Sequence, residues 1–267
     1  MGQQTLQIRT AYAEVIQSHR EWLERFPSAH GNRWENLLRD QPEAAVCEAC
    51  VRQVLDDHVE VVEPGEDPSH GGPDFRCSQR GQIFYVESTC ITSHVATEET
   101  GLSSTLDIDG GFREHSNLTR IILGECRNKA RQCSKVDAPC LLAIGTLHFE
   151  ASMVCCGQSH VEHVLTSRPS ISMAFDAALA QAVGEMFQTT DLRWSAVIRP
   201  ANGTLLEPAR QSISALLVCG FGCRLWEVNG VLHPDPVRRF ERELLPKIPF
   251  CRFTPEYSAG RLMVQWI

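Results

Sequence analysis

The chain has 267 residues, of which 43% are hydrophobic and 22% are charged, as is typical of folded globular proteins and not of disordered, collagenous or coiled-coil chains. The formal net charge of −8 argues against a sequence-independent nucleic-acid coat, which would be basic overall. No stretch approaches the roughly 18 consecutive apolar residues of a membrane-spanning helix, and the start, MGQQTLQ, lacks the basic and apolar regions of a secretory signal.

The first half of the chain shows a clear succession of elements. In chain order we predict helices over 8–26 and 43–57, strands over 59–62, 74–78 and 82–90, a helix over 117–134 and a strand over 141–147. The intervening segments 63–73 and 92–115 are rich in turn-forming residues and predict loops. The order over residues 43–147 is therefore α-β-β-β-α-β, an α/β pattern for which we expect a mixed central sheet with helices on both faces.

The second half is less distinct. We predict helices over 171–188 and 237–245, and strands over 193–199, 213–219 and 224–229. Because no linker is visible, we expect a single domain over 1–267, with a core at 43–147, an N-terminal helical extension at 1–42 and a C-terminal α/β addition at 148–267.

One helix face of the segment 43–57 carries a charge where burial is expected. Ala44, Glu48, Val51 and Leu55 recur at spacings of four, three and four, so Glu48 points toward the core. An unpaired buried carboxylate is costly, and we therefore expect Glu48 to have a partner.

The same helix carries Cys47 and Cys50, two of the twelve cysteines. A four-ligand zinc site needs two matched pairs, and no second CxxC follows. We favour small, buried apolar side chains here, with a zinc site as the alternative. Without an export signal, we expect the cysteines to be reduced thiols of a cytoplasmic protein.

The strand over 82–90 places a second carboxylate on a largely apolar element. Glu87 shares one face with Tyr85 and Thr89. If the preceding turn consists of Arg80 and Gly81 alone, Asp74 lies directly opposite Glu87, with Cβ atoms about 4.5–5.5 Å apart. Two carboxylates at that separation repel each other unless a proton or a metal lies between them, and Mg²⁺ suits such oxygen ligands.

The helix over 117–134 belongs to a basic segment. Residues 113–135 contain six basic and two acidic side chains, whereas residues 35–67 contain two basic and ten acidic ones. The helix face toward the sheet consists of Leu118, Ile122, Glu125, Lys129, Gln132 and, beyond it, Val136. Lys129 and Gln132 are unusual on such a face. One interpretation is a buried ion-pair network without any chemistry.

Together these residues resemble a known family. The string GGPDFRC, a short turn and FYVESTC are similar to the motif of the PD-(D/E)xK nuclease superfamily, whose restriction-endonuclease-like core has the order α-β-β-β-α-β. The resemblance covers residues 43–147. It implies that Asp74 and Glu87, with the backbone carbonyl of Ser88, bind Mg²⁺ or Mn²⁺, and that Glu48 joins them through water.

One position departs from the family pattern. The lysine expected two residues after the glutamate is replaced by Thr89, which supplies no positive charge. Because members of the superfamily relocate this lysine to the next helix, the resemblance makes Lys129 the substitute, with Gln132 beside the site. Thr89 is then able to hold a water, since a hydroxyl both donates and accepts. The resemblance thus implies a metal-dependent phosphodiesterase acting on DNA or RNA.

Two other functions stay open at this point. Thr89 and the acidic balance also suit an inactive member of the same fold that binds nucleic acid or protein, and the cysteines and histidines suit an unrelated α/β enzyme or metal-binding protein.

Arg120, Arg127 and Arg131 lie opposite the buried helix face and are either phosphate contacts or solvated charges. We expect no membrane partner, and a compact domain is compatible with a homodimer.

Overall fold

The computed structural model describes the whole chain apart from a set of short segments. Those segments are residues 1, 68–70, 103–115, 156, 159–160, 162–166, 173–174, 177–180, 183–186, 192–194, 202–204, 224 and 257–260. Parts of the predicted loop 92–115, of the predicted helix 171–188 and of the predicted strand 193–199 therefore lie outside the described residues.

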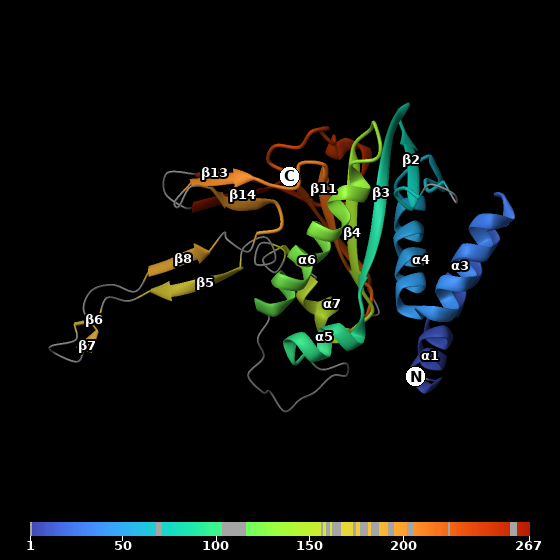
Figure 1. The fold of residues 1–267 in the computed structure, drawn as a ribbon, viewed down its shortest axis with the longest axis horizontal. Coiled ribbons are helices and arrows are strands. Elements are labelled where there is room, and N and C mark those ends of the chain that lie inside the picture. The colour runs from blue at the N-terminus through green and yellow to red at the C-terminus, as the bar shows by residue number, and fades with distance from the viewer. Residues whose placement is uncertain are drawn as a thin grey trace.

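An eight-stranded mixed sheet forms the centre of the molecule (Figure 1). Its order is β1-β2-β3-β4-β11-β12-β13-β14. Its strands are β1 (Val61–Pro64), β2 (Phe75–Gln79), β3 (Gln82–Ile91), β4 (Cys140–Thr146), β11 (Ala215–Gly220), β12 (Glu227–Leu232), β13 (Phe250–Glu256) and β14 (Arg261–Trp266). Strands β1, β2 and β3 pair antiparallel, and β3, β4 and β11 pair parallel. The pairs β11–β12 and β13–β14 are antiparallel, whereas β12 and β13 run parallel. The predicted mixed α/β class is thereby confirmed.

Helices cover both faces of this sheet, as predicted (Figure 1). The helices are α1 (Gly2–Ala11), α2 (Ala13–Leu23), α3 (Ser28–Asp40), α4 (Pro42–Asp56), α5 (Ser93–Thr100), α6 (Ser116–Cys133) and α7 (Phe149–Cys155). Helix α4 packs on one face with the three preceding helices beside it, and α5, α6 and α7 lie on the other. Each face therefore has its own apolar cluster, which explains why every residue of β4 between them is buried.

Close packing brings α4 directly against the central strands. A side chain at Gly145 of β4 would collide with the Sγ atom of Cys47 and with the ring of Phe221. Cys47 and Cys50 are both buried in this contact, as predicted, and the eleven described cysteines are all free thiols. The hydroxyl of Tyr12 donates to the Phe221 carbonyl at 2.8 Å and ties the N-terminal helices to the sheet.

The N-terminal half follows the prediction in element order, with three additions. The segment 8–26 forms two helices instead of one, and α3 and α5 lie where no helix was predicted. Local signals for α5 are present, because the Thr92 side chain caps its first turn and Gly101 ends it in a left-handed conformation.

The C-terminal half departs more strongly. The predicted helix over 171–188 is wrong, since β5 (Ser167–Ser172) pairs with β8 (Phe187–Asp191) across it. Helical propensity is a weak signal that strand pairing overrides. The predicted helix over 237–245 is reduced to a single 3₁₀ turn at Arg242–Leu244. The predicted strand 213–219 is confirmed as β11, whereas 224–229 begins late, as β12.

The remaining strands form two short ribbons outside the large sheet. One pairs β6 (Phe175–Asp176) with β7 (Gln181–Ala182), and the other pairs β9 (Ile198–Ala201) with β10 (Leu205–Pro208). Strand β9 coincides with the end of the predicted strand 193–199. Among the described residues, no helix is both long and apolar enough to cross a membrane.

A histidine is buried in the N-terminal helical layer. His19 is fully buried between the rings of Trp22 and Trp34, with centroid distances of 5.2 and 4.6 Å. Neither ring nitrogen of His19 has a hydrogen-bond partner in the described structure. Burial first, and then the nearby charge of Arg52, lower the pKa of His19 to about 3.

This pKa predicts an acid sensitivity of the fold. The unfolded chain takes up a proton at His19 near pH 6.5, whereas the native chain does not until about pH 3. The free energy of unfolding should therefore fall through this window by about 1.4 kcal/mol per pH unit from this residue alone. Denaturant titrations between pH 7 and 4 should show a shallower decline for His19→Phe, and identical slopes would contradict the assignment.

Candidate functional site

The hairpin of β2 and β3 aligns the two predicted acidic residues. Arg80 and Gly81 both have positive φ angles, of 52° and 73°, and form the two-residue turn that the sequence suggested. The ladder pairs Phe75 with Val86, so Asp74, the residue before β2, continues the register opposite Glu87. The predicted pairing of the two carboxylates across the hairpin is therefore present.

Asp74 is held rigidly by the strand beside it. The backbone N–H and the hydroxyl of Ser88 both donate to Oδ2 of Asp74, each at 2.8 Å. The side chain of Asp74 is only 6% exposed. These two bonds leave the other oxygen, Oδ1, facing a different partner.

Glu87 forms an ion pair with Lys129 of the following helix, the residue that the resemblance places beside the site and that a buried ion-pair network would equally bring there. Nζ of Lys129, on α6, lies 2.7 Å from Oε1 of Glu87. The second oxygen of Glu87, Oε2, is buried and has no hydrogen-bond partner among the described residues. A buried carboxylate oxygen without a donor is unusual and identifies a position where a proton or a cation would be stabilised.

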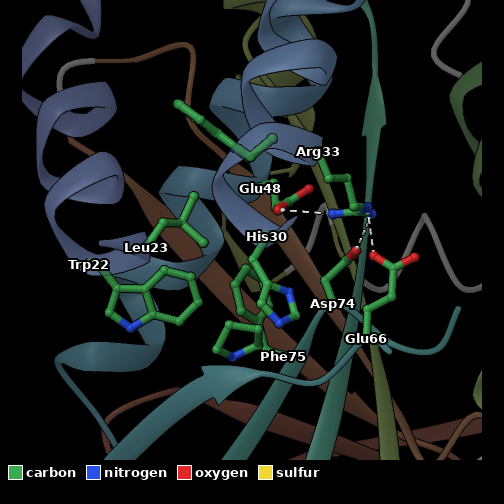
Figure 2. Close-up of a pocket in the computed structure, with 10 residues that line it drawn as sticks. Trp22, Leu23, His30, Arg33, Glu48, Glu66, Asp74 and Phe75 are labelled. Carbon is green, nitrogen blue, oxygen red and sulfur yellow. Dashed lines mark hydrogen bonds and ion pairs between the residues drawn. The ribbon is translucent and has the colours of Figure 1, made fainter. Parts of the chain in front are cut away.

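Arg33 of α3 connects the remaining acids, as Figure 2 shows. Its Nε atom lies 2.6 Å from Glu66, its Nη2 atom 3.3 Å from Oδ1 of Asp74, and its Nη1 atom 3.8 Å from Glu48. The predicted partner of Glu48 is thus an arginine from a helix that the sequence did not predict.

Burial and mutual repulsion shift the protonation of the acids. Burial, reinforced by the charge of Asp74, raises the pKa of Glu87 to about 9 and that of Glu48 to about 8. Burial also raises the pKa of Glu66. Burial alone would lower the pKa of Lys129, but the charge of Glu87 and the hydrogen bond to it raise that pKa overall. Lys129 therefore stays cationic beside Glu87.

Thr89 and Gln132 lie next to the acidic pair without contacting its carboxylates. The hydroxyl of Thr89 donates to Oε2 of Glu125, one helical turn before Lys129, at 2.7 Å. The amide of Gln132 donates to the carbonyl of Gly72 at 2.7 Å. Gln132 thereby fixes the segment that leads into Asp74, which is a positioning role.

The predicted nucleic-acid contacts lie outside the acidic site. Arg120, Arg127 and Arg131 are exposed on the outer face of α6, away from the sheet. Arg127 and Arg131 form no ion pair with any described residue. They are available to an anionic partner, but the structure does not bring them together with Asp74 or Glu87.

Three residues of the site were not predicted. Arg33 lies in a segment without a predicted helix, although the spacing of the buried Trp34 and Leu38 signals one. Glu66 belongs to a turn-rich segment with no periodic pattern. Glu125 was visible on the buried stripe of its helix, but nothing in the sequence indicated that it would pair with Thr89.

A small cavity lies beside Arg33, Glu48 and Asp74 (Figure 2). Trp22, His30, Trp34 and Phe75 line its other side, and its volume is about 10 Å³. This is about the space of one water molecule, so the cavity does not enclose an organic substrate.

The acidic residues of the site offer few side-chain ligands to a metal. Within the described part of the chain, no group of three or more His, Cys, Asp or Glu side chains is arranged to hold a metal ion. Asp74 and Glu87 supply two carboxylates, and a third ligand would have to come from the backbone. Their oxygens are hard donors of the type that Mg²⁺ or Mn²⁺ prefers, and of these oxygens Oε2 of Glu87 has no partner in the described structure.

Comparison of the chain with protein-family models, with curated proteins and with solved structures gave no match. The function is therefore inferred from the geometry of the site.

The Glu87–Lys129 pair makes a testable contribution to stability. At a pH where Glu87 is ionised, Lys129→Met should lower the free energy of unfolding by about 3 kcal/mol, because it leaves a buried carboxylate without its counter-ion. Adding Glu87→Gln should recover part of the loss, since a neutral amide needs no counter-ion. Denaturant unfolding without metal measures both effects, with the exposed Lys135→Met as the control. Purely additive losses in the double variant would contradict the pairing.

Proposed function

We propose that this protein is a metal-dependent phosphodiesterase that cleaves DNA or RNA, with a divergent restriction-endonuclease-like core. The observation that carries the proposal is the ion pair at 2.7 Å between the buried Glu87 and the partly buried Lys129, on the strand opposite Asp74 across a two-residue hairpin. The succession α4, β1, β2, β3, α6 and β4 supports it, with α5 inserted before α6.

Asp74 and Glu87, with the carbonyl of Ser88, would hold Mg²⁺ or Mn²⁺, and Glu48 would join through water. When bound, the ion polarises a phosphoryl oxygen and lowers the pKa of a water molecule. Ser88 fixes the orientation of Asp74 through its two hydrogen bonds before any ion arrives. A carboxylate that is already held in place loses little conformational freedom when it binds an ion. This compensates in part for the small number of side-chain ligands.

Lys129 supplies the positive charge that Thr89 lacks. Its ammonium group orients the attacking nucleophile and stabilises the negative charge that develops on the phosphoryl oxygens. Its raised pKa keeps it protonated for this role. Thr89 donates its hydroxyl hydrogen to Glu125 and keeps its lone pairs to accept a hydrogen bond from a water.

An acidic site repels nucleic acid, so binding energy must come from elsewhere in the chain. The exposed Arg120, Arg127 and Arg131 of α6 supply phosphate contacts in this proposal. The free thiols of the described cysteines suit a reducing compartment, and we place the protein in the cytoplasm. A homodimer stays a prediction.

A binding module of the same fold is the second candidate. Thr89 in the lysine position and the lack of a three-acid metal group in the described residues favour it. Such a module would bind nucleic acid or protein through the basic face of α6 and leave the substrate intact.

Cleavage of labelled double-stranded DNA and of single-stranded RNA in Mg²⁺ and in Mn²⁺ tests the proposal. Asp74→Asn, Glu87→Gln and Lys129→Met should each reduce the rate by about a hundredfold or more, because each removes a group that stabilises the transition state. Glu98→Gln on the exposed surface of α5 is the matched control and should leave the rate unchanged. Nucleic-acid binding without cleavage by the unaltered protein would favour the binding module, and cleavage that survives Asp74→Asn with Glu87→Gln would eliminate the site.

A further inference from the structure

Arg33 joins three acids that come from three separate segments. Glu48 belongs to α4, Glu66 follows β1, and Asp74 precedes β2. The three guanidinium nitrogens each form an ion pair with a different carboxylate, as the dashed lines of Figure 2 indicate, and Nη2 also donates a hydrogen bond to Oδ1 of Asp74. A planar, permanently charged fork is able to satisfy several oxygens at once, which a lysine cannot do.

The contact with Asp74 involves the oxygen that a metal would need. Oδ2 of Asp74 already accepts two hydrogen bonds from Ser88, whereas Oδ1 faces Arg33. A divalent cation that binds Asp74 through Oδ1 therefore meets a position occupied by a guanidinium nitrogen. The guanidinium of Arg33 and a divalent cation cannot occupy the same position beside Oδ1 of Asp74.

Arg33 has contacts other than the one with Asp74. Its contact with Glu66, at 2.6 Å, is much shorter than those with Asp74 and Glu48, at 3.3 and 3.8 Å. The Arg33 side chain is 40% exposed, so solvent reaches the guanidinium. Release of Asp74 would cost the hydrogen bond from Nη2 to Oδ1, whereas the ion pair with Glu66, whose Oε2 accepts no hydrogen bond in the described structure, could remain.

We propose that Arg33 is an internal counter-ion of this site, which occupies the cation position beside Asp74 in the metal-free protein and competes with a divalent cation for Oδ1. This inference rests on the proposed metal-dependent function. Arg33 neutralises the acidic cluster when no metal is present, and it raises the concentration of metal at which the site fills. Glu66 holds the displaced guanidinium at the edge of the site.

Titration calorimetry with Mn²⁺ and no substrate tests the competition. Arg33→Gln should bind Mn²⁺ about tenfold more tightly than the unaltered protein, within the usual range of coupling between two ligands. Arg33→Lys keeps the charge but loses the fork, and it should bind about threefold more tightly. The control is Lys135→Gln, which removes a charge that acts on Glu66 without an ion pair to it in the described structure. It should change the affinity less than twofold.

Thermal unfolding of the same proteins supplies a second readout. Without metal, Arg33→Gln should melt at a lower temperature, because its acids repel, and saturating Mn²⁺ should restore most of the difference. If Arg33→Gln does not fold, the Mn²⁺ affinity of Arg33→Lys tests the competition in its place.

The outcomes separate this inference from the proposed function. Equal Mn²⁺ affinity in Arg33→Gln and the unaltered protein would overturn the competition alone, as would an equally large effect of Lys135→Gln. Absence of Mn²⁺ binding to every protein would overturn both the competition and the metal-dependent function.

Discussion

The site depends on two carboxylates that are held side by side on neighbouring strands, away from water. Asp74 and Glu87 are aligned by a two-residue turn and a regular ladder, so the repulsion between them is fixed by the backbone. Burying such a pair costs free energy unless cations or protons compensate it. The fold supplies the cations Lys129 from α6 and Arg33 from α3, and burial raises the pKa values of Glu87 and Glu48, which favours their uncharged forms.

This constraint explains why separate helices converge at one end of the hairpin. Helix α6 brings Lys129 to Glu87 and, three residues later, Gln132 to the carbonyl of Gly72. Helix α3 brings Arg33 to acids of three other segments (Figure 2). A structure that only had to be stable would more simply place apolar residues here, since replacing buried ion pairs by apolar side chains is often stabilising. Stability alone therefore does not require these charges, which is consistent with the chemical role proposed above.

The sequence predicted those parts of the site that follow from local rules. Alternation along β3, the turn chemistry of Arg80 and Gly81, and the helical spacing of Lys129 each act over a few residues. Arg33 reaches Asp74 across 41 positions of the chain, and no local pattern encodes that contact. The same limit applies in the C-terminal half, where an alanine-rich segment suggested a helix but β5 and β8 pair as strands.

If Asp74 and Glu87 are joint ligands of one divalent cation, anomalous scattering from a crystal soaked in Mn²⁺ tests this most directly. Joint ligation predicts a single strong peak between the two carboxylates, near the Ser88 carbonyl, with Arg33 withdrawn from Oδ1 of Asp74. An absence of any peak there at saturating Mn²⁺, with both ion pairs intact, would contradict it and leave a charged network that serves the fold alone.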